Sequence, residues 1–288
     1  MTVVLSPNPY RDRGLKAAQA AKAILEQAGV RVLMCLPFAL EEGSHVELPQ
    51  GMTFTELQEG LSQADALVCF GGDGTILHAA KGAEAYKVPI LGVNMGSVGF
   101  MAELEHSELS QLSKLPAGEY SVESRMMLDV RVLRGNKTVF RDAALNDAVL
   151  TKGAVARVVD LAVYGDKVLI SQFAGDGVII STPTGSTAYS MSAGGPIVEP
   201  TAQSIVVTPI CAHAFQAKAF VLDARRLVSV RMGFDRRKTA YLSVDGGRAF
   251  KLQHGDRVEI TRSQRQTRLV KLTGRSFYEI LNQKLGKG

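Results

Sequence analysis

Short continuous runs of apolar residues alternate with segments of helical periodicity along the first part of the chain. The apolar runs predict strands buried on both faces, at residues 2–6, 30–36, 66–70 and 88–93. Apolar residues at helical spacing predict helices at 14–27, 54–61 and 75–81, and a short helix near 107–115. This alternation predicts a mostly parallel sheet with helices packed around it.

The period of the pattern changes from helical to alternating at about residue 121. Apolar and polar positions then alternate in four segments, which predict antiparallel strands at 127–133, 158–164, 227–232 and 240–244. The predicted fold class is α/β plus all-β, with a Rossmann-like α/β domain over residues 1–120 and a mainly antiparallel β-sandwich domain over residues 121–270. A closing helix at 276–285 is expected to pack back on the first domain.

Composition narrows the class of protein. Of 288 residues, 46% are hydrophobic and 21% charged, the balance of an ordinary globular protein. No apolar run approaches the ~20 residues that span a bilayer, and the first residues lack the features of a signal peptide. We therefore expect a cytoplasmic protein without a membrane partner. Cys35, Cys69 and Cys211 are odd in number and widely spaced, which predicts reduced thiols and no cysteine-bound metal.

The net charge of +5 does not by itself indicate a nucleic-acid partner. Basic residues are interleaved with acidic ones, and the tight clusters at 225–226 and 236–238 lack the aromatic residues on which bases stack. No nucleic-acid partner is expected. A modest positive field would still help to collect polyphosphate substrates.

A glycine-rich turn follows the apolar run at 66–70 and contains one carboxylate, in the sequence Gly71-Gly72-Asp73-Gly74-Thr75. Glycines let backbone N–H groups approach phosphate oxygens at the start of a helix. The charge of Asp73 should repel those phosphates, unless Asp73 accepts a proton from a hydroxyl or arranges a metal-bound phosphate. The alternative is that Asp-Gly forms a tight turn without function.

A second glycine-rich block runs from Gly175 to Pro196 and gathers many hydroxyl side chains. Small residues permit close approach of a ligand, hydroxyls and amides bind ribose or phosphate, and Tyr189 is suited to stack on a ring. The block therefore predicts a nucleotide site.

Together with Asn146-Asp147, these two blocks resemble the NAD kinases of the bacterial type. The first block alone is shared with phosphofructokinases and with diacylglycerol and sphingosine kinases, whereas the second is far more specific. The resemblance covers essentially the whole chain. It implies an enzyme that uses ATP and Mg²⁺, or another divalent metal, to phosphorylate the 2′-hydroxyl of the adenosine ribose of NAD, giving NADP. It also implies a homodimer or homotetramer.

The resemblance also assigns roles to individual residues. Asp73 would accept the hydroxyl proton, while Gly71, Gly72, Gly74 and Thr75 would contact the phosphates of ATP, and no protein side chain would hold the metal. Asn146 would contact adenine, Asp147 a ribose hydroxyl in place of the family's glutamate, and Asp176 the nicotinamide half. Further contacts to NAD fall on Asp73, Gly74, His78, Phe100, Arg157, Thr187, Ala188, Tyr189, Ser190, Met191 and Ser192.

Several of these positions have a structural alternative. His78 and Arg157 are also suited to be solvated surface residues, with Arg157 alternatively acting in a neighbouring subunit, and Phe100 is also suited to the core. The chain departs from many relatives at Ala174, where they carry arginine, and at Gly247, where they carry glutamine. A lipid kinase with the same first motif and a catalytically silent dinucleotide-binding regulator are the rival functions.

Overall fold

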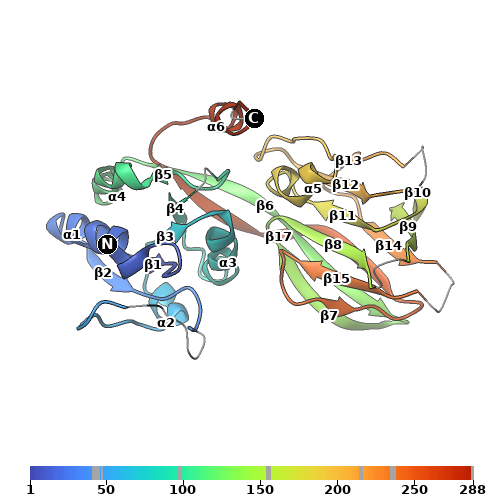
Figure 1. Cartoon of the computed structure of the whole chain (residues 1–288), viewed down its shortest axis with the longest axis horizontal. Coiled ribbons are helices and arrows are strands. Elements are labelled where there is room, and N and C mark those ends of the chain that lie inside the picture. The colour runs from blue at the N-terminus through green and yellow to red at the C-terminus, as the bar shows by residue number, and fades with distance from the viewer. Residues whose placement is uncertain are drawn as a thin grey trace. The chain divides into compact units, whose positions relative to one another are not determined.

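The computed structural model describes residues 1–40, 46, 48–96, 99–153, 157–213, 217–233 and 238–286. The chain divides into two compact units (Figure 1). Unit 1 comprises Met1–Ser124 and Thr267–Gly288, and unit 2 comprises Arg125–Gln266. Each unit encloses a hydrophobic core of its own.

Unit 1 contains the parallel sheet that the apolar runs predict. Its strands lie in the order β4 (Ile90–Asn94), β3 (Ala66–Gly71), β1 (Thr2–Pro7) and β2 (Arg31–Met34). Every residue of β3 and β4 is buried, as the continuous apolar runs indicate. Beyond β4 lie the short strand β5 (Leu104–Glu105) and the end of β17 (Arg257–Lys271), where Leu269 pairs with Ile90.

The helices of unit 1 lie between these strands or follow the last of them. They are η1 Arg13–Leu15, α1 Lys16–Gln27, α2 Leu57–Ser62, α3 Asp73–Ala83, η2 His106–Ser113, α4 Lys114–Ala117 and α6 Phe277–Leu285. The helix predicted at 54–61 begins later because Glu56 takes the N-cap position and accepts the N–H of Glu59 at 2.9 Å. Of the apolar face predicted for the closing helix, Ile280 is buried and Leu285 is exposed.

The strand order of unit 1 creates a switch in chain direction. From β1 the chain passes through α1 to β2 at one side, whereas from β3 it passes through α3 to β4 at the other side. The carboxyl ends of β1 and β3 therefore lie side by side while the connections that leave them diverge. In open α/β sheets, ligands bind in the crevice at such a switch point.

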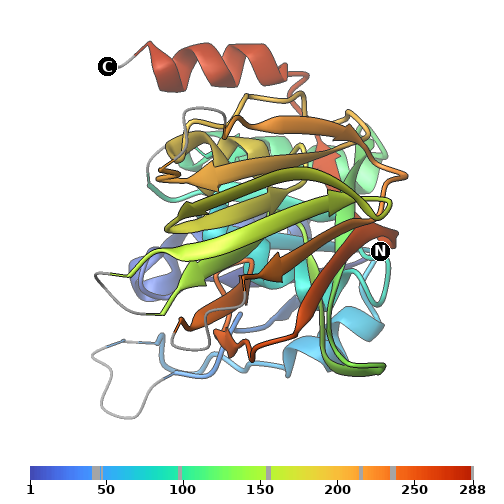
Figure 2. The same cartoon turned by 90° about the vertical axis from the view of Figure 1, so that its right-hand side faces the viewer.

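Unit 2 is a sandwich of two antiparallel sheets. One contains β10 (Val168–Gly175), β9 (Val159–Gly165), β14 (Val228–Met232), β17, β6 (Ser121–Arg134) and β7 (Lys137–Ala144). The strands of the other lie in the order β13 (Phe220–Asp223), β12 (Ser204–Ile210), β11 (Gly177–Ser181), β8 (Asp147–Lys152), β15 (Ala240–Val244) and β16 (Phe250–Lys251). Figure 2 shows the strands of unit 2 from a second direction. Both sheets contribute to one core.

The predicted fold class is confirmed. The four alternating segments form β6, β9, β14 and β15, whose ladders are antiparallel. The alternating pattern did not predict β11 or β12, which are buried on both faces and so carry no alternation. The basic residues at 236–237 and two residues of the segment between β4 and Phe100, at 97–98, lie outside the described residues.

Candidate functional site

The first glycine-rich block forms the junction between β3 and α3. Gly72 is the N-cap of α3, so Asp73 is the first residue of the helix and not part of a loop. A Cβ atom at Gly71 would overlap the side chain of Thr75, which explains a glycine there. The first N–H groups of a helix lack partners within the helix and carry partial positive charge. This junction is therefore suited to bind an anion.

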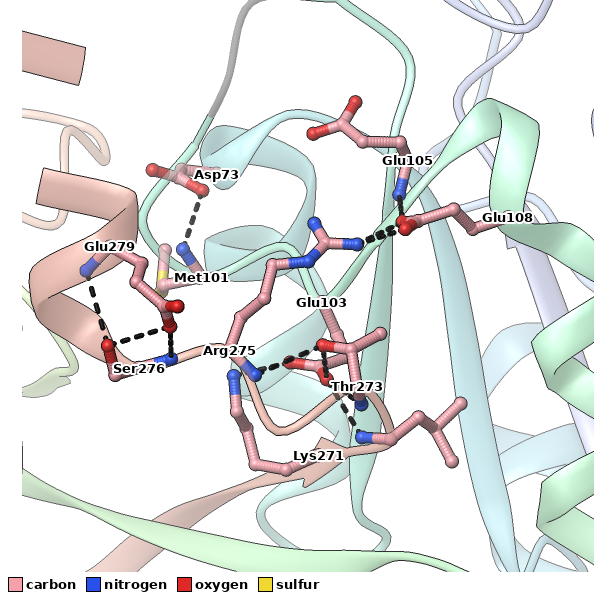
Figure 3. Close-up of polar contacts among 11 residues, drawn as sticks. Asp73, Met101, Glu103, Glu105, Glu108, Lys271, Thr273, Arg275, Ser276 and Glu279 are labelled. Carbon is pink, nitrogen blue, oxygen red and sulfur yellow. Dashed lines mark hydrogen bonds and ion pairs between the residues drawn. The ribbon is translucent and has the colours of Figure 1, made fainter. Parts of the chain in front are cut away.

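The carboxylate of Asp73 is held in place by backbone groups of a second segment. The N–H of Phe100 donates to Oδ2 at 2.8 Å and the N–H of Met101 donates to Oδ1 at 3.0 Å, the second of which is drawn in Figure 3. A Cβ atom at Gly99 would overlap the same carboxylate. Each carboxylate oxygen has two lone pairs, so Asp73 is fixed but keeps capacity to accept another proton.

A cavity of about 230 Å³ lies at the switch point between the ends of β1 and β3. Its lining consists of Asn8, Arg11, Gly72, Gly74, Thr75, Asn94, Met95 and Gly96. Asn8 donates from Nδ2 to Oγ1 of Thr75 at 3.2 Å, which ties the turn after β1 to the start of α3. A guanidinium, two asparagine side chains and a helix N-terminus suit a phosphate group. The sequence reading missed Asn8, Arg11 and Asn94, because Asn8-Pro9 indicated only the end of a strand.

The segment after Phe100 is anchored to the C-terminal part of unit 1 (Figure 3). Glu103 is 2% exposed at its side chain and forms an ion pair with Lys271. One carboxylate oxygen of Glu103 also accepts the N–H of Leu272 at 2.8 Å and the N–H and hydroxyl of Thr273, both at 2.7 Å. Arg275 pairs with Glu108. Glu103 and Glu108, which follow the segment that binds Asp73, are thus bonded to residues 271–275.

Two residues predicted to contact NAD lie away from this cavity. Phe100 is 7% exposed, and its ring packs beside Phe277 at 6.1 Å and under Nζ of Lys284 at 4.2 Å between centres. His78 meets the ring of Phe38 edge-on at 6.0 Å. It lines a separate hollow of about 700 Å³ beside α2. The structure therefore does not bring His78 into the cavity that Gly72, Gly74 and Thr75 line.

In unit 2, Asn146 and Asp147 stand at the start of β8, in a backbone held from both sides. Asp245 accepts the N–H groups of residues 145, 146 and 147 at 2.8, 2.8 and 3.0 Å. Thr182 donates its N–H to the carbonyl of Asn146 at 2.8 Å. The buried Oδ1 of Asn146 has no hydrogen-bond partner among the described residues, which marks it as an acceptor for a ligand.

Asp147 is a buried carboxyl group, 6% exposed. Burial raises its pKa to about 7, and the negative charge of Asp245 adds to the shift. Asp147 therefore changes its charge near neutral pH. The sequence alone indicated neither the burial nor the second carboxylate.

Asp176 lies between β10 and β11 and pairs with a residue that the sequence did not single out. Nζ of Lys152, at the end of β8, lies 2.6 Å from Oδ1 of Asp176. The N–H of Lys152 donates to the carbonyl of Asp176, so side chain and backbone both join the two strands. This places one cation and one anion, both partly exposed, at the opposite end of β8 from Asn146.

The run at 187–192, which the sequence predicted to contact NAD, lies in a short 3₁₀ turn, η3 (Gly185–Thr187), and the one helical turn that follows it, α5 (Tyr189–Ser192). The hydroxyl of Thr187 donates to the carbonyl of Thr184, and the hydroxyl of Ser190 is bonded to that of Thr208 within the protein. Tyr189 is 45% exposed and Ser192 is exposed, whereas Ala188 and Met191 are half-buried. Arg157 is exposed. The run thus divides into internal scaffold and surface groups.

The described residues bring no three His, Cys, Asp or Glu side chains together as a metal site requires. None of the helices in the described part of the chain has the length and apolar character needed to cross a membrane.

Comparisons with known proteins agree over nearly the whole chain. Residues 3–120 match the model of the ATP-NAD kinase N-terminal domain, and residues 145–272 match that of the ATP-NAD kinase C-terminal domain. An NAD kinase of Carboxydothermus hydrogenoformans is 42% identical over 80% of this chain and 82% of its own length. One of Acetivibrio thermocellus is 33% identical over 99% of this chain and 97% of its own length.

Solved structures share the fold. The yeast NADH kinase complexed with NADH superposes with a TM-score of 0.85 at 24% identity, over 99% of this chain and 87% of that one. The NAD kinase of Archaeoglobus fulgidus in complex with ATP gives a TM-score of 0.72 at 23% identity, over 100% of this chain and 98% of that one. The matched domains and the extent of the curated relatives lead to one conclusion: the chain belongs to the ATP-NAD kinase family.

Proposed function

We propose that this protein transfers a phosphoryl group from ATP to the 2′-hydroxyl of the adenosine ribose of NAD, giving NADP. The observation that carries the proposal is a fixed carboxylate, Asp73, as the first residue of a helix whose N-terminus lines an anion-binding cavity. Phosphoryl transfer needs such a combination, because catalysis consists mostly of positioning the phosphate and accepting the hydroxyl proton.

The cavity at the switch point would hold phosphates of ATP. The space beside Gly72 and Gly74, where a Cβ atom would stand, is open. Because neither residue has a side chain, a phosphate in that space can approach the backbone closely. Thr75 and Arg11 add a hydroxyl and a cation to the lining. Mg²⁺ bound to ATP would neutralise charge on the phosphates. The nucleotide and water would hold most of the ion's coordination, as Mg²⁺ usually requires.

Asp73 would accept the proton of the attacking hydroxyl. The two N–H donors from Phe100 and Met101 restrict the carboxylate to one orientation, so the remaining lone pairs point in fixed directions. A fixed acceptor lowers the cost of orienting the reacting groups.

NAD would be recognised by groups of unit 2. The unpartnered Oδ1 of Asn146 suits the amino group of adenine, and Asp147 suits a ribose hydroxyl. The pair of Asp176 and Lys152 suits the nicotinamide half, which carries an amide and lies next to the pyrophosphate. Exposed Tyr189 and Ser192 offer a ring and a hydroxyl.

The test is NADP formation from NAD, ATP and Mg²⁺ by the purified protein and by Asp73→Asn. We expect the substitution to lower kcat at least about a hundredfold, because the amide cannot accept the proton as a base does. Glu26→Gln removes an exposed carboxylate of α1 and should retain wild-type kcat. Absence of NADP from the wild type would refute the proposed function, and equal rates from wild type and Asp73→Asn would refute the role of Asp73.

A homodimer or homotetramer in the cytoplasm belongs to the same proposal. The resemblance of the whole chain to bacterial-type NAD kinases supports it. Light scattering coupled to size-exclusion chromatography measures the oligomer directly.

A further inference from the structure

Asp245 holds the backbone of three consecutive residues in unit 2. It follows β15, and it accepts the N–H of residue 145 at Oδ2 and those of Asn146 and Asp147 at Oδ1. Its own N–H donates to the carbonyl of Asp147 at 2.9 Å. Hydrogen bonds from neutral donors to a charged acceptor are among the strong ones in proteins.

The backbone of Asp245 is shaped for this contact. Its φ is 50°, and the following Gly246 has φ 68°, so two left-handed residues stand in a row. The N–H of Gly247 donates to the carbonyl of Val244 at 2.9 Å and closes the turn. Aspartate and asparagine tolerate this conformation better than most residues.

The opposite side of the same backbone is held as well. Thr182 donates its hydroxyl to the carbonyl of residue 145 at 2.6 Å and its N–H to the carbonyl of Asn146 at 2.8 Å. The backbone N–H groups of Asn146 and Asp147 and their carbonyl oxygens therefore already form hydrogen bonds within the protein. Their side chains are the groups left for a ligand, and Oδ1 of Asn146 is buried without a partner among the described residues.

Asp245 also places a negative charge beside a buried carboxyl group. The residue opposite Asp147 on β11 is Ser181, which is neutral, and the strand on the other side, β15, ends at Val244 before Asp245. Asp245 is the charged group whose field raises the pKa of Asp147 beyond the effect of burial. Like charges in a shared site resist joint ionisation.

We propose that Asp245 is a positioning residue of the NAD site: its carboxylate fixes the backbone of Asn146 and Asp147 and so presents their side chains to the dinucleotide, while its negative charge lies beside the carboxyl group of Asp147. This inference rests on the proposed function, since it assigns Asn146 and Asp147 to NAD. It predicts that affinity for NAD rises as Asp147 ionises, and that Asp245 controls both the affinity and the pH of the change.

The first experiment needs neither NAD nor activity. The carboxyl carbon of Asp147 is followed by NMR from about pH 5 to about pH 9 in the wild type and in Asp245→Asn. Asparagine keeps the size and the left-handed conformation but removes the charge. We expect a midpoint near pH 7 in the wild type and a midpoint about one pH unit lower in the variant. Equal midpoints would overturn the proposal, whether or not the protein makes NADP.

The second experiment measures NAD affinity by calorimetry over the same pH range. An amide offers one acceptor oxygen where the carboxylate offers two, so at least one of the three N–H groups loses its partner. We expect affinity at pH 8 to fall about tenfold in Asp245→Asn, while KM for ATP stays unchanged. The pH at which affinity rises should move with the NMR midpoint. Unchanged affinity with an unchanged pH profile would overturn the proposal.

A matched control comes from another turn of unit 2. Asp166 also has a left-handed backbone, with φ 49°, and its carboxylate accepts the N–H of Leu227 at 2.9 Å. Asp166→Asn should leave the Asp147 midpoint and NAD affinity unchanged. If Asp245→Asn does not fold, NAD affinity is measured against pH in Asp147→Asn instead. We expect the increase in affinity near pH 7, seen in the wild type, to be absent from this variant. Persistence of that change in Asp147→Asn would overturn the proposal.

Discussion

Asp147 illustrates the cost of burying a carboxyl group. A carboxyl group with a raised pKa in the folded state keeps a proton that the unfolded chain releases. The unfolded chain releases it near pH 4, and the folded protein at about pH 7. The free energy of unfolding should therefore decrease as pH rises through this window and stay level above it, as far as this group contributes. Ionised Asp147 destabilises the fold that presents it.

Replacing this group should stabilise the protein at alkaline pH. Asp147→Asn keeps the shape but removes the buried charge, and we expect its gain in unfolding free energy to be roughly 2 kcal/mol larger at pH 8 than at pH 5. Urea unfolding at the two pH values measures it. Asp223→Asn is the control, because this exposed carboxylate has its pKa lowered by hydrogen bonds from Arg225 and should give no gain. An equal effect of Asp147→Asn at both pH values would contradict this account.

Residue spacing predicts some parts of a site and not others. The glycines around Asp73 and the pair Asn146-Asp147 are recognisable because their neighbours in sequence share the task. Asp245 and Lys152 act on residues that other strands bring to them, 98 and 24 positions away. The residues next to Asp245 indicated a turn, and those next to Lys152 indicated no site, so neither pairing was predicted. A single sequence gives no signal for such pairings, which only the strand register creates.

Among the elements, the segment at 99–101 controls Asp73 by close approach. It has no regular secondary structure at Gly99, yet it donates the two N–H groups that fix the carboxylate. Because a Cβ atom at Gly99 would overlap Asp73, a side chain there must displace either the segment or the carboxylate.

Gly99→Ala should therefore lower kcat for NADP formation by at least about tenfold, a cost expected of a small displacement at a reacting group. Steady-state kinetics at saturating NAD and ATP measure it. Gly82→Ala on α3 is the matched control, since its Cβ would meet only the end of Leu61 at 3.2 Å and alanine favours a helix. Wild-type kcat in Gly99→Ala would show that the position of Asp73 does not depend on this contact.

Elements were predictable where burial is uniform or alternates cleanly. The runs at 66–70 and 88–93 became β3 and β4, nearly within their predicted bounds. The strand β11 was hidden inside the second glycine-rich block, where glycines and hydroxyls suggested loop. The helix near 107–115 is mostly 3₁₀, a distinction that apolar spacing does not resolve. Short-range patterns give the kind of element, while tertiary packing sets its ends.

At the scale of the whole molecule, unit 1 is built from two separate parts of the chain. Leu269, Val270 and Leu272 are buried in unit 1, the last two within its hydrophobic core. The buried ion pair of Glu103 with Lys271 joins the parts, and the same carboxylate accepts three further hydrogen bonds from Leu272 and Thr273. Burial opposes ionisation of Glu103, but these bonds and the charge of Lys271 outweigh it, so its pKa lies below the usual range.

Glu103→Ala should destabilise unit 1 by about 3 kcal/mol, because it leaves Lys271 and several buried donors without a partner. A lowered pKa adds stability above the unfolded pKa near 4, and this stability is lost as pH falls through the folded value. The difference between wild type and variant should accordingly be full at pH 7 and shrink below about pH 4. Chemical unfolding measures both. Glu26→Ala, which removes an exposed helical pair, should cost no more than about 0.5 kcal/mol. A loss from Glu103→Ala no larger than this would contradict the role of the network.

Because unit 1 is built from two separate parts of the chain, its two parts are synthesised at different times on the ribosome. Synthesis delivers residues 1–124, then the whole of unit 2, and only afterwards the segment from Thr267 onward. Unit 2 is contiguous, so all of its residues are made before the second part of unit 1. Unit 1 is complete only when the segment from Thr267 onward has been made, because that segment supplies the partners of Glu103. A chain that stops before residue 267 would therefore lack the partners of Glu103, although the N–H groups of Phe100 and Met101 that bind Asp73 belong to the part already made.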